Sequence, residues 1–232
     1  MSVIKCEDLS FAYGTQRVLE GVSFHIEKGE KIGIIGLNGS GKSTLLRLMI
    51  GLLKAESGTM HVLGMPVQRE NLKALHRRVG YVFQNVDEQL FMPTVYDDIA
   101  FGLKGTASAD TVKESVESIL KRFHIMHLRD KAPFQLSGGE KRAVAIATVM
   151  VMAPEIVLMD EPTEGLDARM RRKMTAFVKA SPETFVISSH DSAFIRDICH
   201  RVIVLKTGHL IRIDTPEVLF NDFDFLEANE LI

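Results

Sequence analysis

The sequence has no tryptophan, two cysteines and only 7% aromatic residues among its 232 positions. Cys6 and Cys199 lie far apart, which excludes a disulfide scaffold and favours a reducing compartment. The 28 basic and 30 acidic residues nearly balance, so no nucleic-acid partner is expected. The longest apolar stretch, residues 143–154, falls short of the roughly 20 residues that cross a membrane. Lys5, Glu7 and Asp8 interrupt the N-terminus, which has neither the basic nor the apolar region of an export signal, so we expect a cytoplasmic chain.

What is present is an ordinary globular composition, 46% hydrophobic and 25% charged, in a pattern that alternates strands and helices. Short apolar, β-branched segments suit buried parallel strands, and they are separated by segments with helical spacing. We expect strands at 31–35, 58–63, 79–83, 156–159, 184–188 and 201–205, an antiparallel pair within 3–26, and helices at 43–53, 137–151, 167–179 and 191–199. Such alternation predicts an α/β fold with a mixed, largely parallel sheet and an N-terminal antiparallel β part.

A mostly helical stretch interrupts this alternation and predicts an inserted α-helical subdomain. We therefore expect a single domain over residues 1–232. Its core is expected at about 1–86 and 151–232, and the helical subdomain at about 87–150. A short acidic tail after residue 216 is expected to be helical and could take part in a dimer contact.

Residues 36–43 fit the pattern G-x-x-x-x-G-K-[ST], between an expected strand and an expected helix. Glycines allow close approach of the backbone to phosphates, and the free N–H groups at a helix start favour an anion. A lysine there can reach the β- and γ-phosphates, and the serine hydroxyl can join a magnesium ion. We therefore expect a nucleotide phosphate site with Mg²⁺, formed by Gly36, Asn38, Gly39, Ser40, Gly41, Lys42, Ser43 and Thr44.

Two acids, Asp160 and Glu161, follow an apolar strand, and parallel strands deliver their carboxyl ends to the crevice where ligands bind. Asp160 is expected to hold magnesium, through water, and Glu161 to polarise the water that attacks the γ-phosphate. His190 follows another such strand and can donate a hydrogen bond to a γ-phosphate oxygen. On its own, His190 could equally be a structural histidine.

Residues 136–140 read Leu-Ser-Gly-Gly-Glu and open a long helix. With this motif, the phosphate loop and the acid pair, the chain resembles the ATP-binding-cassette (ABC) ATPases over nearly its whole length. The resemblance implies that Tyr13 stacks on adenine. It implies that Gln84 is the Q-loop glutamine, which acts in hydrolysis and at the magnesium ion. It further implies that His190 is the switch histidine, and that Asp167 closes the D-loop at residues 164–167 and contacts nucleotide.

The resemblance also implies a dimer of ATPase subunits, either homomeric or heteromeric. Ser137, Gly138 and Gly139 form a second small anion site at a helix start. In the family this site faces the ATP that the other subunit's phosphate loop holds. Three positions depart from common family residues, namely Lys141, Ala143 and Ala168. These departures bear on the dimer interface and not on the chemistry.

Residues 83–91 and 93–102 look like those of energy-coupling-factor ATPases, which are importer motors for vitamins and for nickel or cobalt. Among these ATPases, residues 136–147 (LSGGEKRAVAIA) most resemble those of the cobalt and nickel members. This resemblance implies a peripheral protein on the cytoplasmic face of the membrane, with a transmembrane coupling subunit and a substrate-binding membrane component as partners. Three alternatives stay open: a motor for vitamin uptake, a soluble ABC ATPase that serves no transporter, and a regulatory module without turnover.

Overall fold

The computed structural model describes residues 1–105 and 107–231. An antiparallel sheet begins the chain, in the order β2-β1-β4-β5. Its long strands alternate buried and exposed side chains, because one face packs on the core and the other faces solvent. The strands are β1 (Ser2–Tyr13), β2 (Gln16–Glu27), β4 (Ser57–Val62) and β5 (Met65–Pro66). This sheet is the N-terminal antiparallel part that the sequence predicted.

A second, mostly parallel sheet forms the centre of the molecule, in the order β10-β9-β3-β8-β7-β6. All neighbouring strands in it are parallel except β9 and β10. The strands β3, β7 and β8 and the edge strand β6 are buried along their whole length, as their mostly apolar sequences predict. The strands are β3 (Lys31–Ile35), β6 (Val79–Val82), β7 (Ile156–Asp160), β8 (Thr184–Ser188), β9 (Arg201–Lys206) and β10 (His209–Asp214).

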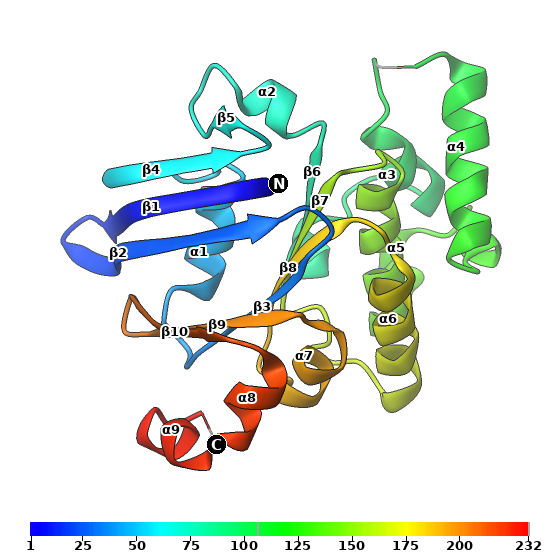
Figure 1. The fold of residues 1–232 in the computed structure, drawn as a ribbon. Coiled ribbons are helices and arrows are strands. Elements are labelled where there is room, and N and C mark those ends of the chain that lie inside the picture. Colours follow the sequence, from blue (N-terminus) through cyan, green and yellow to red (C-terminus); the bar gives the residue numbers. More distant parts are fainter. Residues whose placement is uncertain (106, 232) are drawn as a thin grey trace.

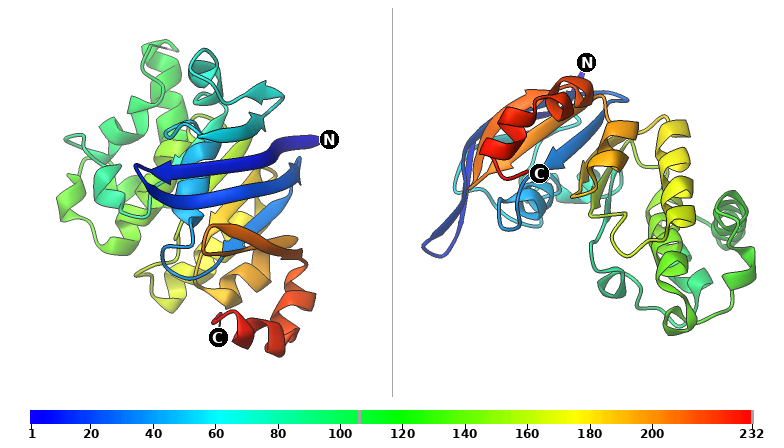
Figure 2. Two further views of the ribbon diagram at one scale, coloured as in Figure 1. Left: turned by 90° about the vertical axis from the view of Figure 1, so that its left-hand side faces the viewer. Right: turned by 90° about the horizontal axis from the view of Figure 1, so that it is seen from below.

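Helices surround the central sheet and extend to one side of it (Figure 1). Seen from below, the antiparallel sheet and the C-terminal helices lie at one end, and α4 lies at the other (Figure 2). The helices are α1 (Lys42–Met49), α2 (Leu72–Leu75), α3 (Val95–Phe101), α4 (Ala109–Arg122), α5 (Gly138–Met150), α6 (Ala168–Ala180), α7 (Ser192–Ile198), α8 (Pro216–Asn221) and α9 (Phe223–Ala228). The short 3₁₀ turns are η1 (Val86–Glu88), η2 (Met126–Leu128) and η3 (Pro133–Gln135).

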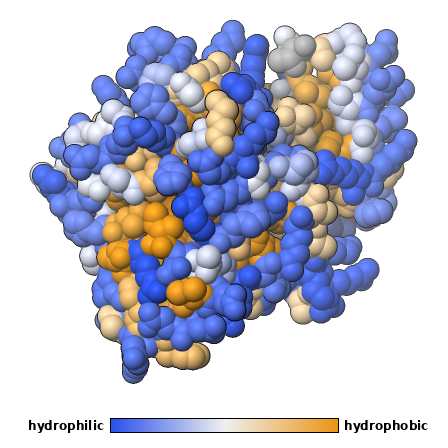
Figure 3. Space-filling model, viewed as in Figure 1, coloured by the Kyte–Doolittle hydropathy of each residue, from blue (hydrophilic) through white to orange (hydrophobic). Residues whose placement is uncertain are grey.

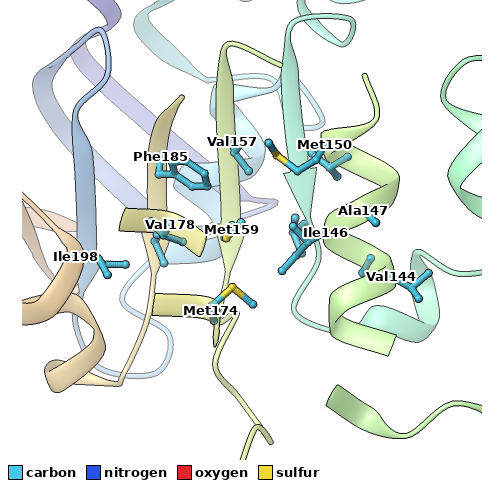
Figure 4. Close-up of a cluster of buried hydrophobic side chains, with 14 of the residues drawn as sticks. Val144, Ile146, Ala147, Met150, Val157, Met159, Met174, Val178, Phe185 and Ile198 are labelled. Carbon is cyan, nitrogen blue, oxygen red and sulfur yellow. The ribbon is translucent and has the colours of Figure 1, made fainter. Parts of the chain in front are cut away.

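Two hydrophobic clusters flank the central sheet. One joins the antiparallel sheet and α1 to one face of the central strands, through residues such as Leu19, Leu45 and Leu158. The other joins α5, α6 and α7 to the opposite face, where Val157, Met159 and Phe185 meet Ile146, Met174 and Ile198 (Figure 4). Residues on successive positions of β7 enter opposite clusters because side chains alternate along a strand. The ends of the central strands are thereby fixed from both sides.

The α/β class and its mixed sheet are confirmed, and three short elements were missed, namely β5, α2 and β10. The division into a core and a helical subdomain stays a prediction, since α5 contacts both β6 and α3. The tail is helical, as α8 and α9, with residue 232 outside the described part.

In Figure 3 most of the visible surface is hydrophilic, with hydrophobic residues gathered around β10. Among residues 1–105 and 107–231 we find no helix with the length and apolarity needed to cross a membrane.

Candidate nucleotide-binding and catalytic site

The loop at residues 36–41 joins β3 to α1, and its glycines hold backbone angles that other residues rarely adopt. Gly36, Gly39 and Gly41 have φ values of 151°, 79° and 102°. A Cβ atom on Gly36 would lie 2.1 Å from the carbonyl oxygen of Leu205, and one on Gly41 would lie 2.6 Å from Leu19. The loop therefore needs glycine at these two positions for both conformation and space.

The groups around this loop suit a bound phosphate. Gly41 occupies the N-cap of α1 and has no side chain with which to cap the helix, which leaves its first turn open to an anion. The Ser40 Oγ is buried and lacks a hydrogen-bond partner among the described residues. The Lys42 Nζ donates to the carbonyl oxygens of Gly36 (2.8 Å) and Leu37 (3.1 Å). Burial lowers the pKa of Lys42, against the attraction of Glu161 and Asp160.

Asp160 ends β7 with its carboxylate held by three hydroxyl groups. Its Oδ1 accepts hydrogen bonds from Ser43 (2.9 Å) and Ser188 (2.6 Å). Its Oδ2 accepts one from Tyr81 (3.2 Å). The carboxylate is almost fully buried, and buried charge is tolerated where it is well hydrogen-bonded. The contact with Ser43 brings together two of the three residues that were predicted to serve the same magnesium ion, the third being Gln84.

Glu161 and His190 lie against each other at the ends of adjacent strands. The backbone N–H of His190 donates to Oε2 of Glu161 (3.1 Å), and the His190 Nε2 lies 3.1 Å from Oε1. That second approach lacks hydrogen-bond geometry, and Oε1 is buried without a hydrogen-bond partner in the described part of the chain. A buried carboxylate oxygen with spare acceptor capacity is suited to hold a water molecule.

A cavity of about 370 Å³ unites most of the predicted nucleotide site. It is lined by Tyr13, Asn38, Gly39, Gly41, Lys42, Ser43, Thr44, Gln84, Glu161 and His190, with Gln16 and Val18. Tyr13 is 46% exposed, so part of its ring is open to the cavity, and it packs edge-to-face with Phe11. Gln84 donates to Glu164 (3.0 Å) and forms no hydrogen bond with Asp160.

The signature residues lie elsewhere, on a separate cavity of about 520 Å³. Ser137 caps α5 in a capping box with Glu140, and Asp167 caps α6 through Met170. Ser137, Gly139 and Asp167 line this cavity, and none of them lines the cavity with the phosphate loop. Ala143, one of the departures from the family pattern, also lines it. One chain therefore does not bring its two anion-binding loops together.

Sequence reasoning missed four residues that shape the site. Ser188 and Tyr81 hold Asp160, and only the pairing of parallel strands brings them to it. Arg142 is buried and donates to the carbonyl oxygens of Phe83 (2.8 Å) and Gln84 (2.9 Å). Lys141, noted only as a departure, forms an ion pair with Asp87 (2.6 Å). An arginine and a lysine early in a mostly apolar helix were the available signals.

The fold and the loop define a phosphate-loop nucleotide hydrolase. Residues 19–164 match the family described as ABC transporter. The chain is 39% identical to the energy-coupling factor transporter ATP-binding protein EcfA of Methanoculleus marisnigri, over 100% of this chain and 86% of the relative. The chain belongs to the ABC transporter ATP-binding family, and it is an ATPase.

Two solved structures share the fold over almost all of the chain. The cbiO1 protein of Clostridium perfringens, described as part of the ABC transporter complex cbiONQ, has a TM-score of 0.86 and 34% identity and covers 98% of this chain and 94% of its own. The cassette MJ0796, solved as a dimer with ADP and Pi in a post-hydrolysis state, has a TM-score of 0.82 and 27% identity. It covers 92% of this chain and 98% of its own. The likeness to ABC ATP-binding proteins is therefore found in both sequence and structure.

Proposed function

We propose that this chain is the ATP-hydrolysing motor subunit of an energy-coupling-factor importer for cobalt or nickel ions. The observation that carries the proposal is the separation of the phosphate loop and the signature motif on two cavities of one chain. Such a chain needs a second copy or a close relative to complete each site. The names of EcfA and of cbiO1, part of the ABC transporter complex cbiONQ, support the transporter assignment. The resemblance of residues 136–147 to the cobalt and nickel members supports the choice of ion. A peripheral place on the cytoplasmic face of the membrane follows from that role.

The residues of the site fit a magnesium nucleotide, because the glycine cradle, the buried Ser40 hydroxyl and the paired Ser43 and Asp160 supply the expected donors and acceptors. In the proposal Tyr13 stacks on adenine, and the loop from Gly36 to Thr44 holds the phosphates. Ser43 and Gln84 would hold Mg²⁺, with Asp160 acting through water. The metal would neutralise charge on the β- and γ-phosphates.

Glu161 is proposed as the group that positions and polarises the attacking water. Its Oε1 is the buried carboxylate oxygen without a hydrogen-bond partner. The His190 ring is half-exposed and lies beside this oxygen, so it can turn toward the γ-phosphate without disrupting the core. The backbone N–H of His190 still holds Oε2 when the ring turns. This arrangement keeps Glu161 oriented while its other oxygen acts on water.

The proposed dimer is head-to-tail, with Ser137, Gly138 and Gly139 of each subunit facing the ATP of the other. The dimeric state of the neighbour with ADP and Pi supports this arrangement. Asp167 at the start of α6 lines the same cavity as the signature, which favours a contact with the partner's nucleotide.

An exposed aromatic pair is the proposed seat for the transmembrane coupling subunit. Phe91 and Phe101 are 62% and 47% exposed and pack edge-to-face at 5.0 Å. They border a cavity of about 230 Å³ that also contains Met152 and Gln89. The buried Asp98 fixes this loop by accepting from the backbone of Phe91 (3.1 Å) and Met92 (3.0 Å). An apolar hollow next to the Q-loop suits an inserted helix from a partner.

The test is co-expression with a transmembrane coupling subunit and a substrate-binding component of the cobalt type, followed by uptake of radioactive cobalt and nickel into cells. We expect uptake with the native chain and none with Glu161→Gln. Phe91→Ser should reduce co-purification with the membrane subunit, whereas Phe223→Ser, an equally exposed change on α9, should not. Uptake of a vitamin and not of metal would move the chain to the vitamin branch. A chain that hydrolyses ATP but joins no membrane subunit would support a soluble ABC ATPase.

A further inference from the structure

A tyrosine on β6 contacts the carboxylate at the end of β7. Tyr81 is only 7% exposed, and its hydroxyl donates to Oδ2 of Asp160 at 3.2 Å. Its ring packs edge-to-face on Phe83, with centroids 4.8 Å apart, and this contact limits the positions open to the phenol. The strands β6 and β7 are parallel neighbours, with Tyr81 paired to Leu158 and Val82 to Met159. This register places the phenol group one strand away from the acid.

The two oxygens of Asp160 have different partners. Oδ1 accepts from Ser43 on the phosphate loop and from Ser188 on β8, whereas the contact of Oδ2 is with Tyr81. A carboxylate held on both oxygens cannot rotate about its terminal bond without losing a hydrogen bond. Tyr81 holds the second oxygen and therefore helps to fix the plane of the carboxylate relative to Ser43.

The Tyr81 phenol also contacts the phosphate-loop helix. Arg47 of α1 has side-chain contacts with both Tyr81 and Tyr13. The phenol thus contacts both a cation from the phosphate-loop helix and an anion from β7.

We propose that Tyr81 is a positioning residue for Mg²⁺, which orients the Asp160 carboxylate so that its Oδ1 and the Ser43 hydroxyl present one metal site. This inference rests on the proposed role of Asp160 and Ser43 in holding the magnesium of a bound nucleotide. It assigns no bond from Tyr81 to the metal or to ATP. Without the phenol group the carboxylate gains a rotational freedom that metal binding must then remove.

The test is Tyr81→Phe, which removes one hydroxyl and keeps the ring. The affinity of the purified protein for a fluorescent ATP analogue is measured over a range of Mg²⁺ concentrations and without Mg²⁺. We expect the Mg²⁺ concentration for half-maximal enhancement of binding to rise about three- to tenfold, the usual effect of one lost hydrogen bond. Affinity without Mg²⁺ should stay unchanged. Tyr96→Phe, on α3 and remote from the loop, is the matched control and should behave as the native chain.

Asp160→Asn separates the inference from the function on which it rests. If Asp160→Asn raises the Mg²⁺ requirement and Tyr81→Phe does not, the inference about Tyr81 is overturned and the proposed function stands. If Asp160→Asn also leaves the Mg²⁺ requirement unchanged, the proposed role of Asp160 is wrong, and the inference about Tyr81 falls with it. A Tyr81→Phe protein that loses affinity equally with and without Mg²⁺ would show a merely structural tyrosine, and this too would overturn the inference.

Discussion

Glu161 has a backbone conformation that glutamate seldom adopts, with a φ of 45°. The conformation is held by its N–H, which donates to both the carbonyl oxygen (3.0 Å) and the Oγ (3.2 Å) of Ser188. Backbone strain of this kind persists where surrounding contacts over-determine it, and it is common at active sites. The turn directs the Glu161 side chain back toward His190, which places the carboxylate inside the nucleotide cavity.

Replacing Glu161 with glutamine tests its role in hydrolysis at nearly constant size. The amide cannot take a proton from water, so we expect phosphate release to fall about 100-fold or more. Nucleotide affinity should remain, because no predicted phosphate contact is removed, and the ATP-bound form should accumulate as a dimer. The measurements are phosphate release, nucleotide binding and size-exclusion chromatography with ATP. Unchanged phosphate release would contradict the assignment of Glu161.

Lys42 is the cation that the loop offers to a nucleotide. In the structure it bonds the loop's own carbonyl oxygens, so its charge is already directed into the cradle. Lys42→Ala should weaken ATP binding about tenfold or more, the value of a charge-assisted contact to phosphate. Lys54→Ala, an exposed lysine beyond α1, is the control and should bind normally. Retained affinity in Lys42→Ala would argue against the phosphate-loop assignment.

At the scale of elements, α5 is tied to the loop that follows β6. Arg142 donates to the carbonyl oxygens of Phe83 and Gln84, and Lys141 forms an ion pair with Asp87. Burial lowers the pKa of Arg142, while Glu164, Asp160 and Glu161 attract its charge. These contacts tie the signature helix to the Q-loop. The Q-loop is also continuous with the proposed seat for the membrane partner.

Arg142→Met removes the two hydrogen bonds and keeps much of the buried stem. We expect the free energy of unfolding to fall by about 1–3 kcal/mol, because two backbone carbonyls lose a charged donor. ATP turnover should fall several-fold as Gln84 loses its fixed position. Urea unfolding and hydrogen exchange of residues 83–90 measure these effects. Native exchange rates in that segment would show that Arg142 does not hold the Q-loop.

At the scale of the whole molecule, Glu30 and Arg201 join the two sheets at the end of the central strands opposite the phosphate loop. The carboxylate binds the guanidinium in two places, at 2.5 and 2.9 Å, and Arg201 also donates to the carbonyl oxygen of His25 (2.9 Å). Burial alone would raise the pKa of Glu30. The hydrogen bonds from Arg201 and from the backbone of Glu27 hold it below its ordinary value.

A depressed folded pKa means that Glu30 contributes stability above its unfolded pKa, and that this stability is lost as the pH falls through the folded pKa. Glu30→Gln should therefore lower the free energy of unfolding by about 1–3 kcal/mol at pH 7. The difference from the native chain should shrink below about pH 4. Chemical unfolding across pH measures it, with the exposed Glu56→Gln as control. An equal difference at pH 7 and pH 3 would exclude the charge as its cause.

A mixing experiment tests the composite site of the proposed dimer. Lys42→Ala disables the phosphate loop, and Ser137→Arg blocks the signature, so each variant alone should be inactive. In a head-to-tail dimer with one subunit of each variant, every site combines the phosphate loop of one subunit with the signature of the other. One site therefore carries both defects, and the other is intact. We expect the mixture to regain ATP turnover, up to about a quarter of the native rate if subunits pair at random and sites act independently. No recovery would indicate that the working dimer is heteromeric or that the sites do not cross subunits.

The sequence by itself determined the parts of this protein whose chemistry lies within a few consecutive residues. The phosphate loop and the acid pair each lie in consecutive positions, so their spacing was enough to predict them, whereas the signature at residues 136–140 was predicted from its resemblance to the family. The buried strands were found for the same reason, since their apolar runs are local. The strand β10 was not predicted, because its polar residues interrupt the alternation of apolar and polar residues that is typical of a strand. The Thr207–Gly208 turn before it, with φ values of 44° and 85°, was the available signal.

Only the tertiary structure decided how residues far apart in sequence meet. The parallel register of β7 and β8 pairs Asp160 with Ser188, and the neighbouring β6 brings Tyr81 to the same carboxylate. No local pattern encodes such a pairing, because strand order depends on the packing of both sheet faces. The same packing places the signature and the phosphate loop on separate cavities. That separation, with the family's need to join the two motifs, underlies the proposal that a second subunit completes the site.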